Sequence, residues 1–141
     1  MLYDKIAGGF GSDKDFNCAE KIFCGANESY GLGLDAETLK LAGGFGGGLG
    51  VESVCGALCG GMMAISRLMV KTTAHQAEGL RPCQEAFMKG YEEEMGSILC
   101  SELKFSYRTK EKGCQRVVEK AAQHLDKIVK QIEEGAWPDK A

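Results

Sequence analysis

Residues 114–132 read CQRVVEKAAQHLDKIVKQI, and this stretch decides the fold class of the chain. Its apolar residues recur at alternating intervals of four and three, which places them on one face of a helix. That face carries Cys114, Val118, Ala121, Leu125, Ile128 and Ile132. Since a helix with one apolar face has to bury that face against other elements, the stretch predicts a long helix packed into a core.

Helical spacing of apolar residues continues through most of the remaining chain. It predicts helices over residues 18–30, 55–69 and 82–95, with shorter helical segments over 35–42 and from Cys100 onward. Residues 43–50, GGFGGGLG, are too rich in glycine for a helix interior and are expected to form a turn before the central helix. No stretch alternates apolar and polar residues as a half-buried strand does. We therefore expect an all-α fold, a bundle of five to six helices forming a single domain over residues 1–141.

Composition and charge narrow the class of protein. With 141 residues, of which 44% are hydrophobic and 26% charged, the chain can bury one core. The net charge is −3 and the Lys and Arg residues are dispersed along the sequence, which argues against a nucleic-acid partner. The most apolar stretch, residues 60–65, is too short to cross a bilayer, and the N-terminus lacks the apolar core of a signal peptide. We expect a cytoplasmic protein with no membrane partner.

The chain has seven cysteines, and four of them stand where the sequence predicts that helices begin: Cys18, Cys55, Cys100 and Cys114. In a reducing cytoplasm a stable disulfide framework does not explain seven cysteines, and the odd number leaves at least one thiol unpaired in a monomer. The unpaired N–H groups and the positive dipole at a helix start lower the pKa of a thiol. We therefore expect these four thiols to have lowered pKa values and to act as nucleophiles or metal ligands.

The cysteines also follow a family pattern. Residues 55–60, CGALCG, resemble the central motif of the small redox-active proteins named for the C_GCAxxG_C_C signature. Residues 17–19 (NCA), the glycine-rich turn, residues 96–100 (GSILC) and Cys114 surround this motif in the order of that family. The resemblance implies that the four family cysteines are Cys18, Cys55, Cys100 and Cys114. It also implies a relation to a domain of the split-Soret cytochromes, which are dimeric electron carriers associated with an iron–sulfur centre.

Three chemistries compete for these four thiols. An iron–sulfur cluster needs cysteine ligands, hydrogen bonds to sulfur and shelter from water, and glycines at 46–48 and Gly56 would let backbone N–H groups approach the sulfurs. A metal-free thiol–disulfide couple needs an attacking and a resolving thiol, although the chain has no Cys-x-x-Cys pair. Structural zinc usually binds paired Cys-x-x-Cys knuckles, so their absence counts against zinc.

The other three cysteines are expected to be packing residues, because a free cysteine is often buried as a small hydrophobe. They are Cys24, Cys59 and Cys83. Cys59 differs from the other two because it lies one helical turn after Cys55, where two Cβ atoms are about 5–6 Å apart. It could serve as a spare ligand. Inert cysteines in a structural or interaction module are the alternative for the whole set.

From the sequence we expect an electron carrier whose four-cysteine site binds an iron–sulfur cluster, or else a thiol–disulfide oxidoreductase or redox sensor. Its partner would be a redox protein or a small thiol. Haem is not expected because the chain lacks Cys-x-x-Cys-His, and nucleotide is not expected because the glycine-rich turn matches no phosphate-binding pattern. The C-terminal helix and Trp137 offer more apolar surface than one small core needs. We therefore expect a homodimer that buries about 1,200–2,000 Å² through them.

Overall fold

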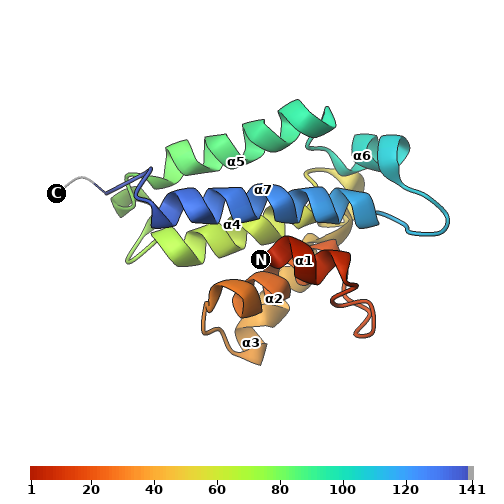
Figure 1. The fold of residues 1–141 in the computed structure, drawn as a ribbon, viewed down its shortest axis with the longest axis horizontal. Helices are drawn as coiled ribbons and strands as arrows, with labels where there is room; N and C mark the ends of the chain where they lie inside the picture. Colours follow the sequence, from red (N-terminus) through yellow and green to blue (C-terminus); the bar gives the residue numbers. More distant parts are fainter. Residues whose placement is uncertain (140–141) are drawn as a thin grey trace.

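Helix α7 (Gln115–Glu133) is the longest helix within residues 1–139, the part of the chain that the computed structural model describes. It runs through the middle of the molecule, in front of α4 and below α5 in Figure 1. Four residues of its predicted apolar face are buried: Val118, Ala121, Leu125 and Ile128. Its most extensive contacts are with α1 (Leu2–Ala7), α4 (Gly56–Met69) and α5 (Leu80–Met95). The predicted long core helix is confirmed.

Helix α2 (Cys18–Tyr30) packs against α4 at close range. Gly60 permits the approach, because a Cβ at this position would lie 2.6 Å from the carbonyl oxygen of Ala19. Asn17 caps α2: its side chain accepts a hydrogen bond from the Glu20 N–H (2.9 Å), and the Glu20 carboxylate accepts one from the Asn17 N–H (3.0 Å). This reciprocal capping box sets the start of α2 at Cys18.

The glycine-rich segment forms tight helical turns between α3 (Ala36–Leu39) and α4. A 3-10 helix, η1 (Lys40–Phe45), is followed by a π-type turn, η2 (Gly48–Glu52). Gly48, Leu49 and Gly50 have φ angles of 61°, 63° and 76°, a left-handed conformation that glycine adopts readily and other residues rarely do. The chain therefore turns sharply just before the central helix.

Helix α1 was not predicted from the sequence. It buries Leu2 and Ile6, and its N-terminus is held by a buried carboxylate from α7. Asp126 accepts hydrogen bonds from the N–H groups of Leu2 and Tyr3, both at 2.9 Å, and from the Tyr30 hydroxyl at 2.7 Å. A six-residue helix is too short to show a periodicity of its own, so its stability comes from this contact with distant parts of the chain.

The remaining elements are η3 (Ala74–Gln76) and α6 (Cys100–Tyr107). Residues 1–139 thus contain seven α-helices and no strand beyond two isolated bridges, so the all-α fold is confirmed, with α1 added to the six expected helices. Within this part of the chain, none of the helices has the length and apolar character needed to span a bilayer. Trp137 packs back against the core of its own chain. The homodimer expected through α7 and Trp137 stays a prediction.

Candidate four-cysteine site

Four helices begin around one small cavity, and each contributes a cysteine at its start. Cys18 and Cys100 are the first residues of α2 and α6, whereas Cys55 and Cys114 are the N-caps of α4 and α7. The cavity, which we call the cysteine cavity, is lined by Cys18, Cys55, Gly56, Cys100, Leu103, Lys104, Cys114 and Val117. The structure therefore brings together the four cysteines that the sequence singled out, although they are spread over most of the chain.

Backbone hydrogen bonds hold the starts of α4 and α6 side by side. The Cys55 N–H donates to the Ile98 carbonyl at 2.8 Å, and the Cys100 N–H donates to the Ser53 carbonyl at 2.6 Å. These bonds flank an isolated antiparallel bridge between residues 54 and 99. Two cysteines that lie far apart in the sequence are thereby fixed at neighbouring positions by main-chain geometry, which side-chain substitutions disturb little.

Gly56 allows the Cys18 sulfur to lie directly against the start of α4. A Cβ at position 56 would be 2.6 Å from Cys18 Sγ and 2.6 Å from the carbonyl oxygen of Phe45. Any larger residue would displace one of these two groups. Gly56 is expected from the sequence to let backbone N–H groups approach the sulfurs, and the Cys18 sulfur lies against the backbone at this position.

A tight turn returns the chain from α6 to the start of α7. The Thr109 and Gly113 main chains exchange two hydrogen bonds, of 3.1 and 2.8 Å, and Gly113 has a φ of 56°. The side chain of Gln115 then donates to the Ile6 carbonyl at 2.9 Å, which ties the first turn of α7 to α1. Cys114 is consequently held at the rim of the same cavity.

The cysteine cavity is small and mainly apolar. Its volume is about 20 Å³, which is close to the space that one water molecule needs. Leu103 and Val117 are buried, and Lys104 is the one charged side chain among the lining residues. The Lys104 ammonium lies 3.8 Å from the Glu52 carboxylate. The thiols therefore share a small, mainly apolar space with a single charged side chain in its lining.

For two of the thiols, burial shifts the pKa upward, which is opposite to the expected direction. The pKa of Cys55 is raised to about 12, with loss of solvation as the main cause. The neighbouring Cys18 contributes to this rise, while the N–H groups of Ala57 and Leu58 act in the opposite direction. Burial also raises the pKa of Cys100, although the Lys104 charge lowers it. The prediction of lowered pKa values is wrong for these two thiols, because desolvation outweighs the helix dipole and the local N–H groups.

The three additional cysteines have different surroundings. Cys24 and Cys83 are buried on α2 and α5 and do not line the cavity, as packing residues would. Cys59 is half-buried on α4, and the Cys18 thiol contributes to its raised pKa after burial itself. Cys59 therefore lies near Cys18, although it is not part of the cavity lining.

The donor set suits a thiolate-ligated metal group in its chemistry, but it is not preformed. Within residues 1–139, no three His, Cys, Asp or Glu side chains are arranged to hold a metal ion. Four cysteine sulfurs facing one apolar space are nevertheless the ligand type that iron–sulfur clusters and structural zinc require. Rotation of the thiol side chains would be enough to change their mutual arrangement, since their main chains are fixed by the helix starts.

Three residues that line the cavity were not predicted from the sequence, namely Leu103, Lys104 and Val117. Their signal was available in the helical spacing. Leu103 and Lys104 follow Cys100 by three and four residues, and Val117 follows Cys114 by three, so each shares a helix face with a cysteine. Lys104 matters most for the chemistry of the site, because it places a positive charge beside the thiols.

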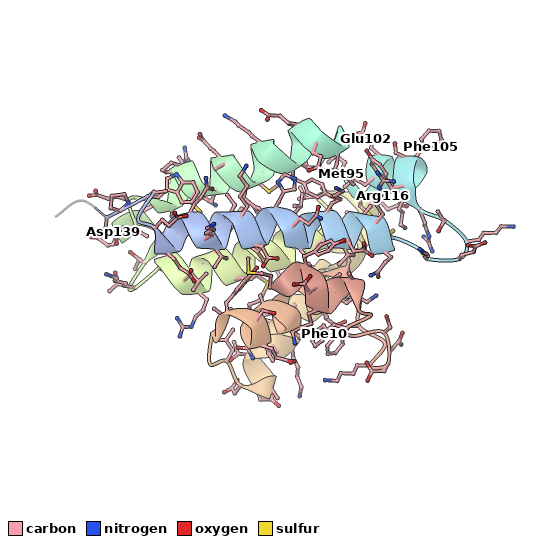
Figure 2. The ribbon with its side chains drawn as sticks, in the orientation of Figure 1. Phe10, Met95, Glu102, Phe105, Arg116 and Asp139 are labelled. Atoms are coloured by element: carbon pink, nitrogen blue, oxygen red, sulfur yellow. The ribbon has the colours of Figure 1, made fainter. Side chains whose placement is uncertain are left out.

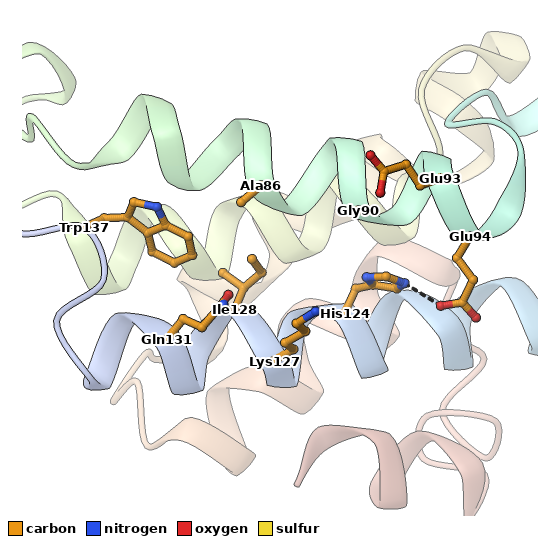
Figure 3. Close-up of a pocket in the computed structure, with 9 residues that line it drawn as sticks. All are labelled: Ala86, Gly90, Glu93, Glu94, His124, Lys127, Ile128, Gln131 and Trp137. Atoms are coloured by element: carbon orange, nitrogen blue, oxygen red, sulfur yellow. Dashed lines mark hydrogen bonds and ion pairs between the residues drawn. The ribbon is translucent and has the colours of Figure 1, made fainter.

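A larger cavity lies elsewhere, between α5 and α7 (Figure 3). It has a volume of about 490 Å³ and is lined by residues of both helices together with Trp137. His124 Nε2 lies 2.8 Å from a carboxylate oxygen of Glu94, and this carboxylate also pairs with Lys120 at 2.8 Å. None of the cysteines lines this cavity. It is a hollow between two helices that is separate from the cysteine cavity.

The helices and the cysteine cavity together define an all-helical protein with a four-cysteine site, in which two thiols are buried and two are half-buried. The family described as "Putative redox-active protein (C_GCAxxG_C_C)" matches residues 16–128, which include all seven cysteines, and the chain belongs to this family. The resemblance noted in the sequence is thus confirmed. Comparisons with curated proteins and with solved structures returned no match.

Proposed function

We propose that this protein is an electron carrier and that the cysteine cavity is its redox site, with an iron–sulfur cluster as the redox group. The observation that carries this proposal is the convergence of four thiols from four helix starts on one cavity. Membership of a redox-active family supports the redox class.

The surroundings of the thiols favour this group. Cluster ligands in proteins are sheltered from water and receive hydrogen bonds at sulfur, and the cavity offers an apolar lining and the N–H groups of a helix start near Cys55. Lys104 adds a positive charge that would offset part of the negative charge of a thiolate-ligated cluster. A bound cluster would supply one-electron transfer. Cys18, Cys55, Cys100 and Cys114 would hold it.

A metal-free thiol–disulfide couple is the second candidate, favoured by the small cavity and by the lack of a preformed ligand set within residues 1–139. In this reaction two thiols would form one sulfur–sulfur bond and release two protons and two electrons. The electrons would pass to a disulfide of a partner protein or of a small thiol, which is reduced to two thiols. Cys55 and Cys18 would be the pair, because the Cys18 thiol is close enough to raise the pKa of Cys55.

Anaerobic reconstitution with iron and sulfide separates these candidates. We expect the wild-type protein to retain iron and sulfide, to absorb visible light and to give an electron paramagnetic resonance signal in one oxidation state. Cys18→Ala, Cys55→Ala, Cys100→Ala and Cys114→Ala should each lose most of the iron. Cys24→Ala and Cys83→Ala are matched controls, since these cysteines do not line the cavity, and both should load normally. Circular dichroism of every variant verifies that the helices are retained.

Other experimental outcomes would identify one of the alternative functions. A protein that retains no iron but forms a reversible disulfide between two of the four cysteines, identified by mass spectrometry, is a thiol–disulfide protein. Retention of zinc would indicate a structural role. The same conclusion would follow if the four thiols resist alkylation and their replacement changes no activity of the protein. Either result would contradict the iron–sulfur proposal.

A further inference from the structure

An exposed apolar patch lies beside the cysteine cavity. Residues 1–139 contain six large hydrophobic side chains that are exposed, and four of them belong to η2 or to the start and middle of α6: Leu49, Val51, Leu99 and Phe105. Phe105 is 95% exposed and Val51 is 77% exposed. The pair formed by Lys104 and Glu52 joins the two elements. Side chains of this type gathered at one junction are characteristic of interaction surfaces.

Positive charge surrounds this patch. Residues 104–120 contain six basic and two acidic side chains, a local charge of +4 in a chain whose net charge is −3. The six basic residues are Lys104, Arg108, Lys110, Lys112, Arg116 and Lys120. Figure 2 shows Phe105 projecting outward from α6, at the end of the molecule opposite Asp139, with Arg116 on the adjacent α7. This one stretch of sequence thus gathers basic residues at one end of the molecule, in contrast to the dispersal expected for the chain as a whole.

Three of these cations are available to a partner. Arg108, Lys110 and Lys112 are exposed, and their side chains form no ion pair within residues 1–139. The other three have partners in the chain: Lys104 pairs with Glu52, Lys120 pairs with Glu94, and the Arg116 guanidinium lies 5.5 Å from the centre of the Tyr107 ring. The unpaired cations surround the turn between α6 and α7, next to Phe105.

The surface is continuous with the redox site. Cys100, Leu103 and Lys104 line the cysteine cavity from α6, the same helix that exposes Phe105. A protein seated on this surface would therefore lie one helix away from the four thiols. We propose that the surface formed by Phe105, Val51 and the basic residues 108–112 docks an acidic electron-transfer protein with an apolar centre to its contact face. This inference rests on the proposed redox function and adds the chemistry of the partner.

Charge decides between this occupant and a second copy of the chain. In a two-fold dimer through this surface, the same cations would face one another, and like charges across an interface cost binding free energy. An acidic partner replaces that repulsion with attraction and speeds association. Nucleic acid and anionic lipid would also attract cations. However, Glu111 stands between Lys110 and Lys112, and Glu102 and Glu119 flank the region, a mixture that suits a protein surface better than a continuous polyanion.

The test uses an acidic plant-type [2Fe–2S] ferredoxin as the probe, added to the ¹⁵N-labelled full chain with its thiols reduced. We expect amide resonances of residues 99–116 to shift, and binding to weaken as the salt concentration rises from about 20 to 200 mM. Arg108→Glu combined with Lys110→Glu should weaken binding about tenfold or more. Lys127→Glu combined with Lys130→Glu makes the same charge change on the far part of α7 and should leave binding unchanged.

A second pair of variants tests the apolar centre. Phe105→Ala should weaken ferredoxin binding several-fold, whereas Leu41→Ala, which removes an exposed hydrophobe from η1, should not. The inference is overturned by a lack of binding, by resonance shifts on another face, or by equal effects of the two charge-reversal pairs. Tighter binding to a single-stranded oligonucleotide or to phosphatidylserine vesicles than to ferredoxin would also overturn it. Because binding requires neither iron nor reactive thiols, failure of the redox proposal alone would leave these results intact.

Discussion

Gly56→Ala should disturb the cysteine cavity through a single added methyl group. In the structure, a Cβ at this position lies 2.6 Å from Cys18 Sγ, 2.6 Å from the Phe45 carbonyl oxygen and 3.0 Å from the Gly46 Cα. Ordinary contact requires about 3.5–4.0 Å, so the sulfur or the backbone has to move by about 1 Å. Two of the three contacts are with backbone atoms, and the cavity of about 20 Å³ cannot absorb the methyl group without a shift of the thiols.

The effect on stability should be modest and the effect on the site large. Overpacking costs about 1–3 kcal/mol, and the better helix propensity of alanine returns up to about 1 kcal/mol. We therefore expect a loss of about 0–2 kcal/mol in the free energy of unfolding. A displacement of about 1 Å at one of four ligands should reduce iron retention several-fold, because metal sites tolerate little misplacement.

Gly61→Ala is the matched control for this variant. It lies in the same helix, and its Cβ would be 2.7 Å from Cζ of the buried Phe87 ring, so it overpacks the core at a place that has no cysteine. Urea denaturation should give similar losses for both variants. Iron content after anaerobic reconstitution, and the rate of thiol labelling where no iron binds, should change in Gly56→Ala alone. Equal iron content and equal labelling in the two variants would refute the role assigned to Gly56.

Three further predictions concern the remainder of the molecule. Asp126→Ala should lower the free energy of unfolding by about 3 kcal/mol in urea titrations, because each buried donor left unpaired costs about 1–3 kcal/mol. The donors to this carboxylate are Leu2, Tyr3 and Tyr30. Asp126→Asn keeps one acceptor and should lose less stability. Burial holds the pKa values of Tyr30 and Tyr91 well above 10. The unfolded state therefore releases these protons first, and the free energy of unfolding should fall as the pH rises above about 10. Tyrosinate absorbance from both residues should appear only with unfolding, and ionisation of all four tyrosines in the folded protein would contradict this. Light scattering should return about twice the mass of the 15.2 kDa chain if the predicted homodimer forms, and the mass of one chain would exclude it.

Except for α1, the sequence predicted the α-helices and the position of each cysteine within them. Helix formation in this chain is signalled locally, by the spacing of apolar residues from Val118 to Ile128 and by the capping box of Asn17 and Glu20. These signals need only residues three or four positions apart. For the same reason the sequence placed Cys18, Cys55, Cys100 and Cys114 at helix starts, which is where the structure has them.

Only the tertiary structure brings those helix starts together around one cavity. The convergence of four thiols depends on the bridge between residues 54 and 99, the close contact at Gly56 and the turn before Cys114, all of which join distant segments. The pKa of Cys55 rises because packing removes water, and desolvation outweighs the local dipole that the sequence could reveal. Helix α1 follows the same rule: Asp126 acts on neighbours in space, and local sequence patterns carry no information about such neighbours. The basic residues of 104–120 are clustered in the sequence itself, and the structure adds their position beside the cysteine cavity.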